Sequence, residues 1–160
     1  MRLVLAFVSL LLVAVSSHAA DPVYLDQLME MPQTTLESYF GEVRKENCYR
    51  LGEDRFLLVS MDRKEAKPWR VAYTSVPCRG REVSPMDIRQ RKGVELGDSS
   101  VKIVEKMGRP DAAAEPEPQL RKLGETEYFY VCRVSEGCAR HSSVFIRDGV
   151  VTGLAEWYSQ

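Results

Sequence analysis

The sequence predicts an α+β fold in which short helices pack on an antiparallel sheet. Two segments, residues 21–41 and 98–108, carry apolar residues at the i, i+3, i+4 spacing of an amphipathic helix. Shorter runs of β-branched and aromatic residues are separated by turn signals, the clearest being Asp148-Gly149, which is typical of a two-residue hairpin. The 160 residues are 44% hydrophobic and 28% charged, the composition of an ordinary globular domain.

Residues 1–20 are expected to be a secretory signal peptide rather than part of the fold. Arg2 precedes an apolar run from Leu3 to Val15, and small residues follow at the expected cleavage site. The alternative, a transmembrane anchor, needs roughly 20 apolar residues where this run has about 13. No cysteine lies near the cleavage site, so the mature chain is expected to have neither a lipid anchor nor a transmembrane helix. The sequence therefore predicts a periplasmic or secreted protein.

In the first half of the mature chain, residues 21–41 are predicted to be helical. Pro32 interrupts this segment or starts a second helix, and Gly41 ends it. Beyond it we expect strands at residues 56–60 and 69–76, a charged turn at 61–68 between them, and a connector at 77–85.

The second half begins with a short helix. Asp98, Ser99 and Ser100 offer N-caps for it, and Gly108 and Pro110 end it. Residues 112–119, rich in Ala, Glu and Pro, are predicted to form a surface loop. Strands are expected at residues 128–134, 143–147 and 150–157.

Four cysteines in an exported chain are expected to form disulfides. Cys132 and Cys138 flank a turn-like stretch between two strand-like runs, so a bridge between them is sterically reasonable and leaves Cys48 to pair with Cys78. The alternatives, a zinc site or a redox dithiol, require Cys-x-x-Cys pairs or clustered histidines, which the sequence lacks. We therefore predict no metal and no other cofactor.

The two halves also resemble each other in sequence. Leu36, Phe40 and Gly41 align with Ile103, Met107 and Gly108, while Leu51-Gly52-Glu53 aligns with Leu123-Gly124-Glu125. This alignment superposes residues 56–60 on residues 128–132 and predicts two tandem helix-plus-sheet units, 21–80 and 81–160, within one compact domain. The alternative is coincidence, because Leu-Gly-Glu uses common residues.

The stretch Gly97-Asp-Ser-Ser-Val-Lys-Ile-Val-Glu-Lys-Met-Gly108-Arg-Pro110-Asp resembles a short helix of known families. It is similar to the helix of the SmpA/OmlA small envelope lipoproteins and of the β-lactamase inhibitor protein superfamily. The resemblance implies helices on an antiparallel sheet, with Ile103 and Met107 facing the sheet. It also implies protein–protein binding rather than catalysis. Unlike the lipoprotein branch, this chain has no lipobox cysteine.

The charge balance and the scarcity of histidine exclude several functions. Lys and Arg number 22 and Asp and Glu 23, a balance that argues against nucleic acid and anionic membranes as partners. His141 is the one histidine beyond the predicted signal peptide, and the sequence has no G-x-S-x-G, P-loop or G-x-G-x-x-G motif. We therefore predict a protein without catalytic residues, although a small hydrolase centred on His141, with Ser142 or a carboxylate, is the alternative.

Aromatic residues on the predicted strands remain as candidates for contact with a partner, because tyrosine and tryptophan are enriched in protein-binding hot spots. Phe56 is predicted to lie on the face equivalent to that of Tyr128 and Tyr130, and Trp69 to share a face with Tyr73. The alternative is that many of them form the core. The sequence thus favours a binding module, either an inhibitor of an exported enzyme or an envelope factor. The candidate residues are Phe56, Trp69, Tyr73, Tyr128, Tyr130 and Trp157.

Overall fold

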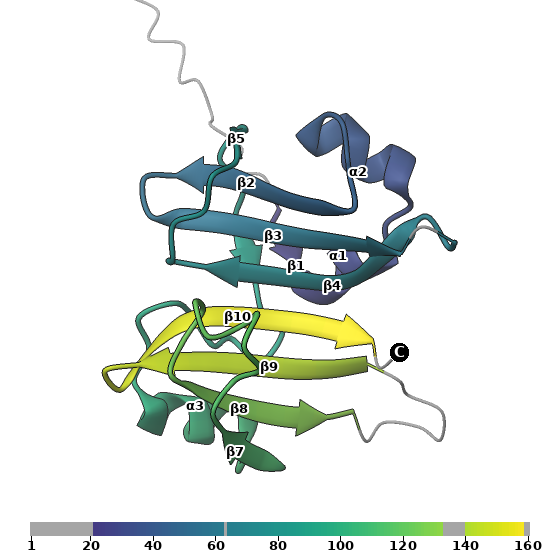
Figure 1. Cartoon of the computed structure of the whole chain (residues 1–160). Coiled ribbons are helices and arrows are strands. Elements are labelled where there is room, and N and C mark those ends of the chain that lie inside the picture. The colour runs from purple at the N-terminus through teal and green to yellow at the C-terminus, as the bar shows by residue number, and fades with distance from the viewer. Residues whose placement is uncertain (1–20, 63, 133–139, 159–160) are drawn as a thin grey trace, which may run out of the picture.

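The computed structural model describes residues 21–62, 64–132 and 140–158 and has the predicted α+β class, with few short helices and a mostly antiparallel sheet (Figure 1). The predicted signal peptide lies outside the described residues. No helix within them is long or apolar enough to cross a membrane. In the first half the elements are β1 (Val23–Tyr24), α1 (Leu25–Glu30), α2 (Gln33–Phe40), β2 (Glu46–Gly52), β3 (Arg55–Asp62), β4 (Lys67–Thr74), β5 (Arg81–Glu82) and β6 (Ile88–Arg89). In the second half they are α3 (Ser100–Met107), β7 (Ala112–Ala114), β8 (Thr126–Val131), β9 (Arg140–Arg147) and β10 (Val150–Tyr158).

The main sheet joins the two halves of the chain edge to edge. Its strand order is β5-β2-β3-β4-β10-β9-β8-β7. The last strand of each half, β4 or β10, therefore lies at the centre of the sheet, and the earlier strands of each half lie further out. Every neighbouring pair is antiparallel except β2–β5, and β1 and β6 form a separate parallel pair. Asp148 and Gly149 both have positive φ, as a tight hairpin turn requires, and form the predicted turn between β9 and β10.

The helical part of the sequence alignment matches the structure. Helices α2 and α3 have 8 residues each and end at Gly41 and Gly108, whose φ angles are 76° and 82°. Leu36 and Ile103 occupy equivalent positions, and both are fully buried. Ser99 is the N-cap of α3, and its hydroxyl accepts the Lys102 N–H.

The strand part of the alignment does not match the sheet order. Leu51 and Gly52 end β2, whereas residues 123–125 precede β8, so the superposition of residues 56–60 on 128–132 sets β3 against β8. By position in the sheet, β3 corresponds to β9. Five strands of the described residues were also missed. Three of them, β1, β5 and β6, have two residues each, and β1 lies at the start of the segment 21–41 that was predicted to be helical. β2 is largely polar and half-exposed, and β7 is three exposed alanines at a sheet edge within the predicted loop 112–119.

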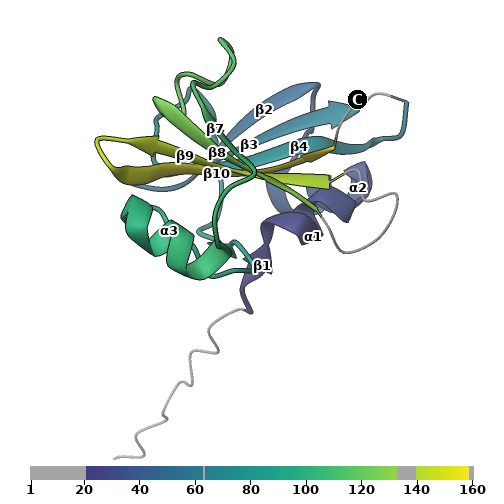
Figure 2. The ribbon, with the colours of Figure 1, turned by 90° about the horizontal axis from the view of Figure 1, so that it is seen from below.

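The helices all lie on one face of the sheet (Figure 2). The main core fills the space between them and the strands, and its largest members include Leu25, Phe40, Leu57, Ile103 and Leu154. The opposite face, here called the open face, carries no helix among the described residues. Residues 115–123, here called the strap, leave β7 and cross this face in front of β8, β9 and β10 (Figure 1). A small second core, made by Ala72, Leu123, Phe145 and Ala155 with Leu58 and Leu120, lies between strap and sheet.

Candidate functional site

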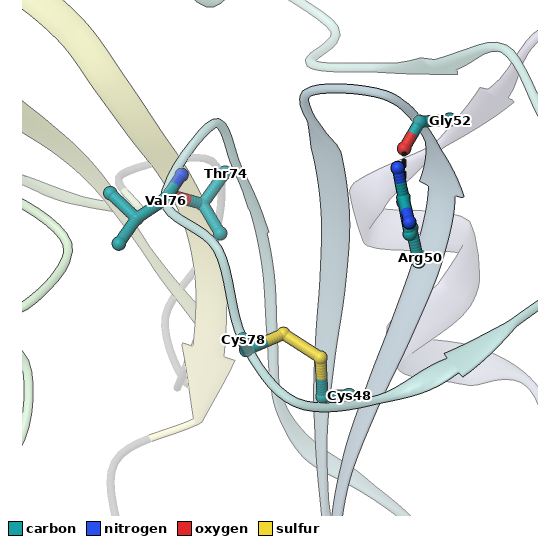
Figure 3. Close-up of a disulfide and its surroundings, with 6 residues drawn as sticks. All are labelled: Cys48, Arg50, Gly52, Thr74, Val76 and Cys78. Atoms are coloured by element: carbon teal, nitrogen blue, oxygen red, sulfur yellow. Dashed lines mark hydrogen bonds between the residues drawn. A yellow bond between two sulfur atoms is a disulfide. The ribbon is translucent and has the colours of Figure 1, made fainter.

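The predicted disulfide between Cys48 and Cys78 is present and lies at the open face (Figure 3). Their Cα atoms are 6.3 Å apart, and the bridge joins β2 to the segment that follows β4. Thr74 Oγ1 accepts the Val76 N–H at 3.0 Å and helps to turn the chain toward Cys48. A side chain at Gly80 would place its Cβ 2.1 Å from the Cys48 carbonyl oxygen, so glycine is required there. The second predicted pair, Cys132–Cys138, extends outside the described residues, which do not include Cys138.

An aromatic cluster stands on the open face over β8, β9 and β10. The ring centroids of Phe129 and His141 are 5.1 Å apart, those of His141 and Trp157 5.0 Å, and those of Phe129 and Trp157 5.6 Å. His141 and Trp157 are direct cross-strand partners, which explains why their rings meet. All three side chains are half-buried, so their rings remain partly accessible from the solvent.

A cavity of about 220 Å³ lies beside this cluster, between the sheet and the strap. Its floor comes from β4, β8, β9 and β10, and its other walls from β7 and the strap. Five of the seven floor residues are apolar, the exceptions being Arg70 and Glu127, so the site favours an apolar group over a strongly hydrated one. The lining residues are Trp69, Arg70, Glu127, Phe129, Phe145, Ala155 and Trp157 on the main strands, Ala112 and Ala114 on β7, and Glu117, Gln119 and Leu120 on the strap.

Hydrogen bonds hold Trp157 in place at this cavity. Its indole Nε1–H donates to Ser143 Oγ at 3.0 Å, and the Ser143 hydroxyl in turn donates to Glu127 Oε1 at 2.5 Å. Ser143 is fully buried, so each of its hydrogen bonds satisfies a group removed from water. The indole is therefore presented in a fixed orientation, as a binding anchor requires.

Arg70 is the second lining residue whose side chain is held in place by its contacts. Its guanidinium lies 4.6 Å from the centroid of the Trp69 ring, and its Nη2 donates to Ser60 Oγ at 3.2 Å. Ser60 donates to Glu46 Oε2 at 2.7 Å, which leaves that carboxylate 4.0 Å from the guanidinium. Burial lowers the pKa of Arg70 from its ordinary value. The arginine nevertheless keeps its charge at neutral pH.

The six aromatic residues predicted to contact a partner are divided between the two faces. Trp69 and Trp157 line the cavity, and Phe56 lies on the open face but is buried near Pro77 and Cys78. Tyr73, Tyr128 and Tyr130 pack against the main core on the helix side. The prediction that Phe56 shares an equivalent face with Tyr128 and Tyr130 is therefore wrong.

A register irregularity separates Trp69 from Tyr73, which were predicted to share a face. Ser60 pairs with Arg70 but Met61 pairs with Pro68, so Trp69 is an extra residue on β4. Such a bulge changes the direction of a side chain relative to the alternating pattern. Sequence reasoning also missed Phe129, Phe145 and Leu120. Phe129 could have been recognised, because alternation places it opposite Tyr128 and Tyr130.

A charged cluster lies on the helix side of the sheet, around a cavity of about 540 Å³. Arg140 lies 3.7 Å from Glu156 and 3.8 Å from Asp26 of α1, which also pairs with Arg91. Ser142 donates to Glu156 at 2.7 Å. Burial raises the pKa of Glu156 to about 7, although the Ser142 hydrogen bond and Arg140 lower it and Asp26 raises it further.

This arrangement bears on the alternative catalytic site. His141 faces the open side with Trp157, whereas Ser142 faces the helix side with Glu156, because successive residues of a strand point to opposite faces. The structure therefore does not bring His141 and Ser142 together. No group of three or more histidine, cysteine or acidic residues within the described part of the chain could hold a metal ion.

Comparisons with known proteins give a similarity of fold. No family model matches the chain, and no curated protein matches it by sequence. Among solved structures, the chain is similar to a DUF4309 family protein (YjgB) from Bacillus subtilis, with 12% sequence identity and a TM-score of 0.52. The similarity covers 81% of this chain and 80% of that one. At this identity the likeness concerns the fold alone, because one fold can carry many functions.

Proposed function

We propose that this chain is an exported, non-catalytic module that binds another protein through the open face of its sheet. It would act either as an inhibitor of an exported or envelope enzyme or as an accessory factor of the envelope. The observation that carries the proposal is the asymmetry of the sheet. Helices cover one face, whereas the other presents half-buried aromatic rings around an apolar cavity.

The chemistry of the open face suits protein binding. Trp69, Phe129 and Trp157 offer large apolar areas that lose little conformational entropy on binding. Trp157 is already oriented by Ser143, so little further ordering is needed when a partner arrives. The resemblance of residues 97–111 to the β-lactamase inhibitor protein superfamily supports the same class of function.

The disulfide supports export. Bridges such as Cys48–Cys78 persist in oxidising compartments and are rare in the cytosol. Together with the apolar segment Leu3–Val15, it supports a periplasmic or secreted location. The hydrolase alternative has less support, because His141 lies between two aromatic rings on the face opposite Ser142.

Site-specific photocrosslinking tests the proposed face. A photoreactive phenylalanine analogue would replace Phe129 on the open face or, as the control, Tyr39, which is 54% exposed on α2. Crosslinking would be carried out in the cells that produce the protein. We expect a discrete adduct from position 129 that disappears when Trp157→Ala is added, and none from position 39. Adducts from position 39 alone, or from neither position, would contradict the proposal.

A further inference from the structure

The apolar cavity is one end of a longer depression on the open face. A second cavity, of about 300 Å³, adjoins it and shares Arg70, Gln119 and Leu120 with it. This second cavity reaches the Cys48–Cys78 bridge. The two cavities together, here called the trough, run from Trp157 at one end to Arg79 at the other, with Leu120 of the strap between them.

The apolar end of the trough has the size of one large side chain. Its volume is about 220 Å³, and an apolar cavity of about 150 Å³ is sufficient for benzene. The chain has two tryptophans, Trp69 and Trp157, and both line this end. An aromatic or branched aliphatic side chain would bury its surface there against four aromatic side chains, those of Trp69, Phe129, Phe145 and Trp157.

The other end of the trough is basic. Arg70, Arg79 and Lys122 line the second cavity. Glu46 lines it too, and Glu117 of the adjoining cavity also acts on Arg70, so the cations that face no such carboxylate are Arg79 and Lys122. Arg79 and Lys122 are exposed, and neither lies within ion-pair distance of a carboxylate in the described residues. The whole chain has a net charge of −1, so this basic end is a local departure from the overall balance. Unpaired cations beside an apolar pocket attract an anionic group and fix its register.

We propose, on the basis of the proposed function, that the trough binds an extended segment of the partner protein that carries a large apolar side chain and, within a few residues of it, acidic side chains. The apolar side chain enters the cavity between Trp69 and Trp157. The acidic side chains lie over Arg79 and Lys122. Residues 1–20 of the chain itself do not have this chemistry, because they are apolar but contain no aspartate or glutamate.

A library of random linear peptides displayed against the purified, disulfide-bonded protein tests this proposal. We expect the selected peptides to combine an aromatic or aliphatic residue with nearby aspartate or glutamate. The best tryptophan-free peptide should change the emission of Trp69 and Trp157. Its affinity should fall at least about tenfold in the Arg79→Glu/Lys122→Glu variant, because two attractive charges become repulsive.

The matched control is Lys45→Glu/Lys64→Glu, which reverses two exposed lysines that line neither cavity and should leave the affinity unchanged. Three results would overturn the proposal: no enrichment, selected peptides without acidic residues, or equal binding to the Arg79→Glu/Lys122→Glu variant. If the photocrosslink from position 129 still forms in that case, the open face remains the binding face and the partner has another chemistry. If that crosslink is also absent, the proposed function fails as well.

Discussion

At the scale of single residues, the two sides of β10 show how alternation assigns different roles to neighbouring side chains. Glu156 points to the helix side, where Arg140 and Ser142 contact it, and Trp157 points to the open face. The first is a buried acid that the fold must accommodate, and the second is an oriented, half-exposed ring. A sequence pattern of apolar and polar residues gives no indication that Glu156 is buried, because glutamate is almost always found at the surface.

Glu156 should make the stability of the protein depend on pH. Its pKa is raised from 4.5 to about 7 in the folded state. Between these values the folded state binds more protons at Glu156 than the unfolded chain does. The contribution of Glu156 to stability is therefore fully present below about 4.5 and is lost as the pH rises through about 7. Removing the charge with Glu156→Gln should stabilise the protein at pH values above the folded pKa, by an amount on the order of 3 kcal/mol at most. Below the unfolded pKa it should have little effect.

Urea unfolding on both sides of this pH window measures the effect. Glu105→Gln, at an exposed position of α3, is the matched control and should not alter the pH dependence. A Glu156→Gln variant that is less stable than the natural protein above the folded pKa would show that pairing with Arg140 outweighs the burial of the carboxylate.

Some residues of the candidate site could be predicted from their amino-acid type alone. Trp69 and Trp157 could be identified as candidates because large aromatic residues are frequent in binding sites. The sequence could not show that these two residues lie at the same cavity, because this depends on the extra residue at position 69 and on the pairing of β4 with β10. Arg70 and Leu120 join the site through contacts with distant segments, which local sequence patterns do not report.

At the scale of elements, the sequence predicted the features that local chemistry controls. Pro32 separates α1 from α2, Gly41 and Gly108 end their helices, and Asp148-Gly149 forms the last hairpin. β2 was missed because it is largely polar, and long-range contacts hold it: it pairs with β3 and β5 and is tied to Cys78. Pairing of this kind depends on residues far apart in the sequence, so no local signal marks it.

The disulfide between these elements should contribute much of the stability of the first half. It closes a loop with a sequence separation of 30 residues, for which the loss of unfolded-state entropy corresponds to about 3–4 kcal/mol. We expect Cys48→Ser/Cys78→Ser to lower the free energy of unfolding by about this amount. Chemical denaturation monitored by circular dichroism measures the loss.

The single variant Cys48→Ser is not a suitable control, because it leaves a reactive thiol. A better control is Ser84→Ala, which changes an exposed residue of the nearby connector and should have little effect on the free energy of unfolding. A loss well below 1 kcal/mol in the double variant would contradict this role of the bridge and would indicate that β2 is held by strand pairing alone.

At the scale of the whole molecule, the two halves share one sheet and one covering helix. β4 and β10 are hydrogen-bonded along residues 70–74 and 153–157. α1 belongs to the first half but contacts both β4 and β10, and Tyr158 donates a hydrogen bond to Glu30 of that helix. The trough crosses the same boundary, since Trp69 and Trp157 come from different halves. Separating the halves would therefore expose the main core and divide the trough.

This shared core predicts that the two halves of the chain unfold together. Trp157→Phe leaves Trp69 to report on the first half, and Trp69→Phe leaves Trp157 to report on the second. In urea, the emission of each single-tryptophan variant should change with the same midpoint as its own circular dichroism signal, as a two-state transition requires. A midpoint that differs between the two probes of one variant would show that the halves unfold separately. In that case α1 would not couple them, and the open face could exist in a half-formed state in which Trp69 and Trp157 no longer line a common cavity.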